Sequence, residues 1–148
     1  FLSPKEKLNY VYLITTPSIN SDNIDTAFDL LLSFSKRNLS KEYTILYYIK
    51  LAELYAYEST PKKQKKYFKK AYKQLKKLKY KVNLSTMDTF VEKSSQMDEF
   101  NIALNSISKY PNKNDQLFLL ASLNLSTNQK KLKSQIKSLE LFAKKYKK

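Results

Sequence analysis

The chain of 148 residues contains no glycine. Glycine supplies the positive φ angles of tight hairpin turns and of phosphate-binding loops. Its absence therefore excludes Walker loops, dinucleotide-binding fingerprints and nucleophile elbows. Asparagine, serine and proline punctuate the sequence instead, and no stretch alternates apolar and polar residues as a strand does. The composition predicts an all-α protein.

Cysteine and histidine are missing too. Thiol catalysis, disulfides, histidine general bases and nearly all zinc sites are excluded with them. Asp22, Asp25 and Asp29 share helical spacing, but acids are ordinary in a first helical turn and no calcium-binding loop surrounds these three. Asp98 and Glu99 are the carboxylates that an enzyme hypothesis would test first. We therefore expect no enzyme, no cofactor and no metal site.

Acidic residues are scarce relative to basic ones. The chain has 28 Lys and Arg against 13 Asp and Glu, a net charge of +15, and Arg37 is its single arginine. A charge of this size favours contact with a polyanion or an acidic partner. A genome rich in A and T would favour lysine as well, so compositional bias is the competing explanation.

Long apolar runs are also absent. No segment approaches the ~20 apolar residues of a membrane span, and we expect no transmembrane segment. The start, FLSPKEKLNY, has neither an initiator methionine nor the apolar core of a signal peptide. We expect a piece of a longer protein or the mature part of an exported one. The missing methionine and cysteine favour a bacterial cell-envelope (periplasmic) location over a cytoplasmic one.

Several short stretches carry the signals of helix starts. Ser3 and Glu6 have the spacing of a capping box, with a proline at the first helical position between them. Thr60 precedes a proline in the same way. The stretches STMD (85–88) and SQMD (95–98) also resemble capped helix starts.

Apolar residues recur at helical spacing after each of these signals. The pattern predicts eight helices in four antiparallel pairs, forming one helical-repeat domain over residues 1–148. The pairs are expected at 4–37, 41–80, 86–110 and 115–147. The last helix is expected to begin near Ser126 and to carry Leu132, Ile136 and Leu139 on its apolar face.

Residues 51–75, LAELYAYESTPKKQKKYFKKAYKQL, resemble a tetratricopeptide repeat (TPR). The positions that match the family pattern of large, small and aromatic residues are Leu51, Ala52, Tyr55, Phe68 and Ala71. Gln64 departs from the pattern, because the family has a small residue there. Residues 86–111 match more weakly. The resemblance implies a TPR-like α-solenoid and a non-catalytic protein-interaction or scaffolding module that binds a peptide or partner domain in a groove.

In such repeats the ligand face lies beside the buried line of the first helix. By resemblance, this implies partner contacts for a set of residues off the Ala52–Tyr55 line: Tyr47, Lys50, Glu53 and Tyr57. The implied partner is another protein or peptide of acidic character, which the lysines would steer into place.

The alternative is a nucleic-acid or polyanion binder. Residues 60–81 hold eleven lysines and no acid. The candidate phosphate contacts lie on the sides of this helix left open by its apolar stripe: Lys62, Lys65, Lys66, Lys69, Lys73 and Lys76. The same lysines also fit a helix side that is simply solvated, with their stems covering apolar surface.

Overall fold

The computed structural model describes residues 2–125, 140 and 143–144. Within these residues the chain is all-α, as predicted, with seven α-helices, one 3₁₀ turn and no strand. The elements, in order, are α1 (Pro4–Thr15), α2 (Ile24–Leu32), η1 (Lys36–Asn38), α3 (Lys41–Tyr57), α4 (Pro61–Lys77), α5 (Leu84–Gln96), α6 (Phe100–Lys109) and α7 (Lys113–Leu125). The helix predicted from Ser126, with Leu132, Ile136 and Leu139, lies outside the described residues.

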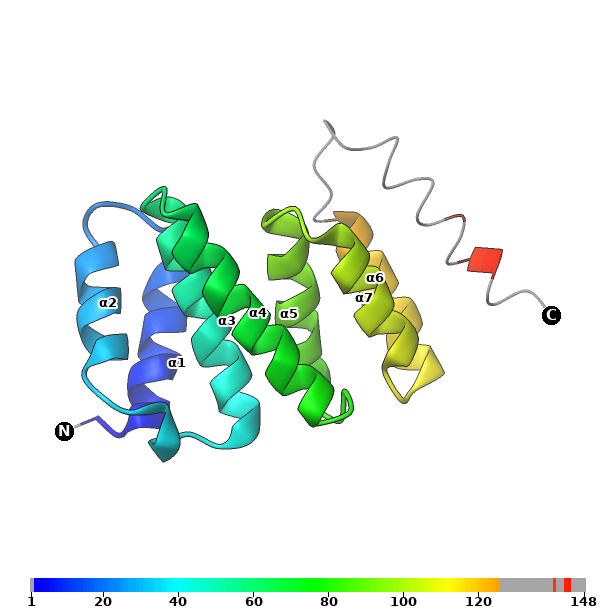
Figure 1. Cartoon of the computed structure of the whole chain (residues 1–148), viewed down its shortest axis with the longest axis horizontal. Helices are drawn as coiled ribbons and strands as arrows, with labels where there is room; N and C mark the ends of the chain where they lie inside the picture. Colours follow the sequence, from blue (N-terminus) through cyan, green and yellow to red (C-terminus); the bar gives the residue numbers. More distant parts are fainter. Residues whose placement is uncertain (1, 126–139, 141–142, 145–148) are drawn as a thin grey trace. The chain divides into compact units, whose positions relative to one another are not determined.

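Contacts divide the chain into two compact units, Phe1–Leu78 and Lys79–Lys148. In the first unit α1 packs on α2 and α3 packs on α4, while in the second α5 packs on α6. These three pairs, visible in Figure 1, confirm the first three predicted ones. Helix α7 packs against both α5 and α6.

None of α1 to α7 has the length and apolar character needed to cross a bilayer, and this finding covers the described part of the chain only. The single domain stays a prediction.

The first helix begins where the sequence places it. The Glu6 backbone N–H donates to the Ser3 hydroxyl at 3.2 Å, and the Ser3 backbone N–H donates to the Glu6 carboxylate at 3.0 Å. These two bonds form the predicted capping box and satisfy N–H groups that have no partner within the helix. The bond from the Ser3 backbone lowers the pKa of the Glu6 carboxyl.

The core of the first unit lies around α3. This helix buries residues on nearly all of its sides, including Ile45, Ile49 and Leu54, each 0% exposed. Ala52 and Ala71, both fully buried, let the backbones of α3 and α4 approach closely. Each large aliphatic side chain that is buried stabilises the fold by roughly 1.5–3 kcal/mol.

The second unit has its own core between α5, α6 and α7. The fully buried side chains that meet there include Met87, Phe90, Val91, Ile107 and Leu119. The Tyr110 hydroxyl donates to the Val82 carbonyl at 2.7 Å and so ties the end of α6 to the segment before α5.

Two helices end in Schellman motifs without glycine. At the end of α3 the N–H of Thr60 donates to the Tyr55 carbonyl at 2.9 Å, and Ser59 adopts a φ of 57°. At the end of α5 the N–H of Glu99 donates to the Ser94 carbonyl at 2.8 Å, and Asp98 adopts a φ of 65°. Both residues occupy the left-handed position that glycine usually takes.

The prediction of a helix start at SQMD (95–98) is therefore wrong. Ser95 belongs to α5 and is 7% exposed, and α6 begins later, at Phe100. The stretch contains a helix end because the capping pattern of small polar residues also suits a left-handed C-terminal turn when glycine is absent.

We expect Ser59→Gly to stabilise the first unit by roughly 0.5–1 kcal/mol. A residue with a Cβ costs roughly 1–2 kcal/mol in the left-handed region, and glycine removes that cost but adds about 0.5–1 kcal/mol of chain entropy. Ser59 is exposed, so no packing is lost. Urea unfolding followed by circular dichroism measures the change. Ser59→Val, which places a branched side chain at the same φ, serves as the control, and a Gly variant less stable than wild type would contradict the expectation.

Candidate anion-binding surface

Helix α4 presents the largest set of like charges in the described structure. All nine of its lysines are exposed, and the helix contains no Asp or Glu. We call these nine the lysine surface: Lys62, Lys63, Lys65, Lys66, Lys69, Lys70, Lys73, Lys76 and Lys77. The side of α4 that faces α3 is apolar and buries Phe68, Ala71 and Leu75. This packing leaves the other sides of the helix to the lysines, and the six lysines predicted as phosphate contacts all belong to the exposed set.

Tyrosine rings lie beneath the lysines, between α3 and α4. The Tyr55 and Tyr67 rings stack with centroids 5.5 Å apart and planes 8° apart, and Tyr48 stacks on Tyr67 at 6.0 Å. The Lys70 ammonium lies 5.5 Å from the Tyr67 centroid, and that of Lys63 lies 5.1 Å from the Tyr55 centroid. Burial raises the pKa of Tyr55, and the neighbouring Tyr67 adds to the effect. The faces of these rings already contact other side chains of α3 and α4. The lysines above them are exposed and can contact a partner.

The four residues predicted as a ligand face do not share an exposed face. Tyr47 is 8% exposed, and its hydroxyl donates to the Leu31 carbonyl at 3.3 Å. Lys50 is 1% exposed and Glu53 is 16% exposed, whereas Tyr57 is 48% exposed. The placement of Tyr47 and Lys50 on an open groove is therefore corrected: α3 has neighbours on several sides, so residues off its Ala52 line are buried too.

Lys50 forms a buried polar cluster with side chains of α1 and α3. Its ammonium pairs with the Glu53 carboxylate and lies 4.5 Å from the centroid of the Tyr12 ring. The Tyr12 hydroxyl donates to the Leu46 carbonyl at 2.7 Å. Burial, and secondarily the charge of Glu53, raises the pKa of Tyr12 well above its ordinary value. The sequence signal for this cluster was the apolar character of α3 on nearly every side, which is typical of a helix surrounded by others.

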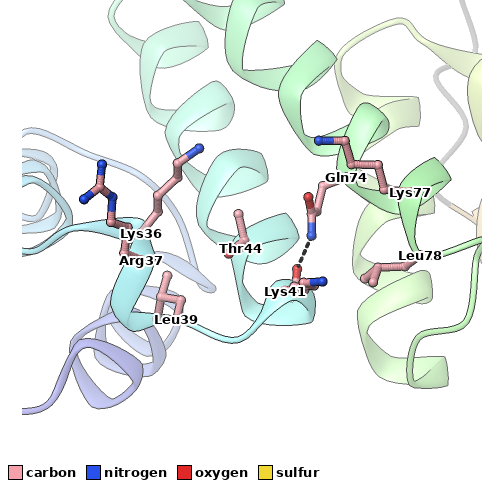
Figure 2. A pocket seen from close by; sticks show the side chains of 8 residues that line it. All are labelled: Lys36, Arg37, Leu39, Lys41, Thr44, Gln74, Lys77 and Leu78. Atoms are coloured by element: carbon pink, nitrogen blue, oxygen red, sulfur yellow. Dashed lines mark hydrogen bonds between the residues drawn. The ribbon is translucent and has the colours of Figure 1, made fainter.

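A basic hollow in the first unit is a feature that sequence analysis missed. It is an open concavity of about 490 Å³ between η1, the start of α3 and the end of α4 (Figure 2). The lining residues are Lys36, Arg37, Leu39, Lys41, Thr44, Gln74, Lys77 and Leu78. Three separate segments contribute the cations, so no local motif reveals them.

The acidic residues weighed in the sequence are dispersed. Asp22, Asp25 and Asp29 are exposed, and so is Asp98, while Glu99 is partly buried at the start of α6. In the part of the chain that the structure describes, no three acidic side chains come together in a group that could hold a metal ion.

No family model matches the chain, and no curated protein and no solved structure matches it either. The resemblance of residues 51–75 to a tetratricopeptide repeat stays a prediction.

Proposed function

We propose that the chain is a non-catalytic binding module whose lysine surface binds a polyanion, the phosphate backbone of nucleic acid. The observation that carries the proposal is that all nine lysines of a helix without a single acid are exposed. On a mixed-charge helix, neighbouring carboxylates would neutralise part of this field, but α4 has none to do so.

The spacing of the charges supports a phosphate polymer. Helix α4 has 17 residues, a length of about 25 Å at the usual helical rise. Its nine lysines amount to roughly one cation per 3 Å, close to the phosphate spacing of about 3.4 Å along one nucleic-acid strand. A compact protein surface seldom carries acids at that linear density, because most of its exposed area is apolar or neutral.

The chemistry of the surface favours binding without sequence preference. Arginine makes most base-specific contacts, and Arg37, the single arginine, lies outside α4. Tyr55 and Tyr67, which could otherwise stack on bases, are stacked on one another. Lysine contacts to phosphate then supply the affinity, and they carry no sequence information.

We propose further that the helix pairs are TPR-like repeats. The burial of Leu51, Ala52, Phe68 and Ala71, all at 3% exposure or less, supports this because the repeat pattern uses these positions for packing between its two helices. In this hairpin the second helix, α4, buries only its apolar stripe against α3. That arrangement leaves α4 available as a contact surface.

The test is binding of labelled duplex and single-stranded oligonucleotides between about 50 and 200 mM salt. The variant replaces four central lysines of α4 with glutamine: Lys65, Lys66, Lys69 and Lys73. We expect wild-type affinity to fall by ~10³-fold or more over this range. A plot of log affinity for duplex against log salt concentration should be less steep for the variant. Its slope should be smaller in magnitude by about 3–4, because each of the four lost phosphate contacts accounts for about 0.9.

The matched control removes four exposed lysines outside α4: Lys5, Lys81, Lys109 and Lys113. Both variants have the same net charge, so a difference between them reports position and not total charge. An equal effect of the two variants would contradict a defined surface. Wild-type binding that vanishes by ~150 mM salt would leave the lysines as a solvated helix side.

A protein partner is the second candidate, and one observation favours it. Leu117 and Phe118 are adjacent on α7 and are 60% and 53% exposed. Large apolar side chains exposed side by side are a feature of protein contacts. Tyr57, 48% exposed, would belong to a contact of this kind as well. Binding of an acidic peptide that persists at ~200 mM salt, where oligonucleotide binding has fallen, would support this candidate over the first.

A further inference from the structure

The basic hollow differs from the lysine surface in shape and composition. It is a concavity of about 490 Å³, whereas the lysine surface follows one helix. A volume of this size lies within the range of about 300–1,000 Å³ that is usual for small-molecule sites. Only Lys77 belongs to both features. The hollow is therefore a feature distinct from the lysine surface.

The lining of the hollow is positive and contains no acid. Lys36 and Arg37 come from η1, Lys41 begins α3 and Lys77 ends α4. Glu42, the acid in the first turn of α3, is not among the lining residues. Four cations around one cavity repel one another, and a bound anion would turn that repulsion into attraction.

Two of the cations face each other across the hollow. Figure 2 shows the side chains of Lys36 and Lys77 extending from opposite sides into the space over Thr44 and Gln74, whereas the guanidinium of Arg37 turns away. The Lys36 ammonium lies 5.4 Å from the centroid of the buried Tyr48 ring. This cation–π contact restrains the Lys36 side chain at the hollow. The side chain therefore loses less conformational entropy when it binds an anion.

Polar groups between the cations complete the set of donors. The Gln74 side-chain amide donates one hydrogen to the Lys41 carbonyl at 3.2 Å, and its nitrogen carries a second hydrogen. Each lysine ammonium has three N–H groups that rotate freely to meet an acceptor. The Thr44 hydroxyl, by contrast, donates to the Ser40 carbonyl at 2.9 Å and is already engaged. The donors approach the cavity from several directions.

We propose that this hollow binds a small phosphate-bearing anion of the size and charge of a diphosphate. Phosphate oxygens accept several charge-assisted hydrogen bonds at once, which suits donors arranged on opposite walls. A single carboxylate is planar, carries one charge and would reach only one wall. The site does not depend on the polyanion proposal, because Lys36 and Lys41 lie outside α4 and a free diphosphate is too short to follow a helix.

The experiment is isothermal titration of the whole chain with inorganic pyrophosphate at about 150 mM salt, where exposed charges are largely screened. The variant is Lys36→Gln with Lys41→Gln. The matched control, Lys5→Gln with Lys81→Gln, makes the same charge change at exposed positions outside the hollow and outside α4. We expect the affinities of the wild type and the control for pyrophosphate to agree within about twofold. The hollow variant should bind pyrophosphate at least tenfold more weakly, a loss of about 1.4 kcal/mol in binding free energy.

Equal weakening in the two variants would overturn the proposal, because binding would then follow net charge alone. No binding of pyrophosphate by the wild type at concentrations up to about 10 mM would overturn it as well. All substituted side chains are exposed, and circular dichroism checks that both variants keep their helix content. Oligonucleotide binding by the hollow variant is measured as well. If the variant still binds oligonucleotides, the lysine surface functions independently of the hollow, and failure of the pyrophosphate test would not contradict the polyanion proposal.

Discussion

Lys50→Ala is expected to destabilise the first unit by about 3–5 kcal/mol, the usual loss when one member of a buried ion pair is removed. Lys50 is 1% exposed, and its ammonium pairs with Glu53, which is 16% exposed. The substitution deprives a largely buried carboxylate of its ion pair. It also removes the lysine stem and the contact with the Tyr12 ring.

Hydrogen exchange of the α3 amides measures this loss, because their protection reports the opening of the unit that contains Lys50. The matched control is Lys69→Ala, the same change at an exposed position of α4, which is expected to stay within about 0.5 kcal/mol of wild type. Lys50→Met combined with Glu53→Gln should recover much of the stability, because it removes both charges. A loss of under ~1 kcal/mol for Lys50→Ala would contradict the buried pair.

Phe90→Ala is expected to destabilise the second unit by about 3–5 kcal/mol, the range for phenylalanine truncated in a packed core. Phe90 lies on α5, which packs against α6 and α7, and it is 0% exposed. Alanine would remove most of the buried apolar surface of the side chain. It would also leave a cavity that helices on two sides cannot close fully.

Amide protection in α5 and α6 is the measurement for Phe90→Ala, with urea unfolding as the second readout. Ser85→Ala, an exposed position on the same helix, is the control and should change stability by less than about 0.5 kcal/mol. Phe90→Leu keeps most of the volume and should lose less than Phe90→Ala. Equal losses for Phe90→Ala and Ser85→Ala would contradict a packed core at this position.

The sequence predicted the helices well where their signals are local. The capping box of Ser3 and Glu6 acts within one turn, and the structure contains both of its hydrogen bonds. The apolar stripe of Phe68, Ala71 and Leu75 is buried, as helical periodicity predicts. The error at SQMD has a local cause as well, because Asp98 takes the left-handed conformation that glycine takes in most proteins.

The candidate sites were harder to predict because they depend on contacts between distant segments. The partners of Lys50 include Tyr12, which lies on another helix, and nothing in the stretch around Lys50 indicates that ring. The basic hollow brings η1 and the start of α3 to the end of α4. Periodicity gives the side of a helix on which a residue lies, but it does not identify the distant segment that packs against that side.

The sequence alone determined the all-α class, the helix pairs over its first 110 residues and the excess of positive charge. Each of these depends on composition, periodicity or capping, which act over a few residues. Tertiary structure decided which lysines are free to bind. Lys50 is buried because α3 is enclosed by its neighbours, whereas all nine lysines of α4 stay exposed because that helix buries only its apolar stripe. Removing a charge from water is costly, so burial determines whether a lysine supports the fold or remains open to a partner.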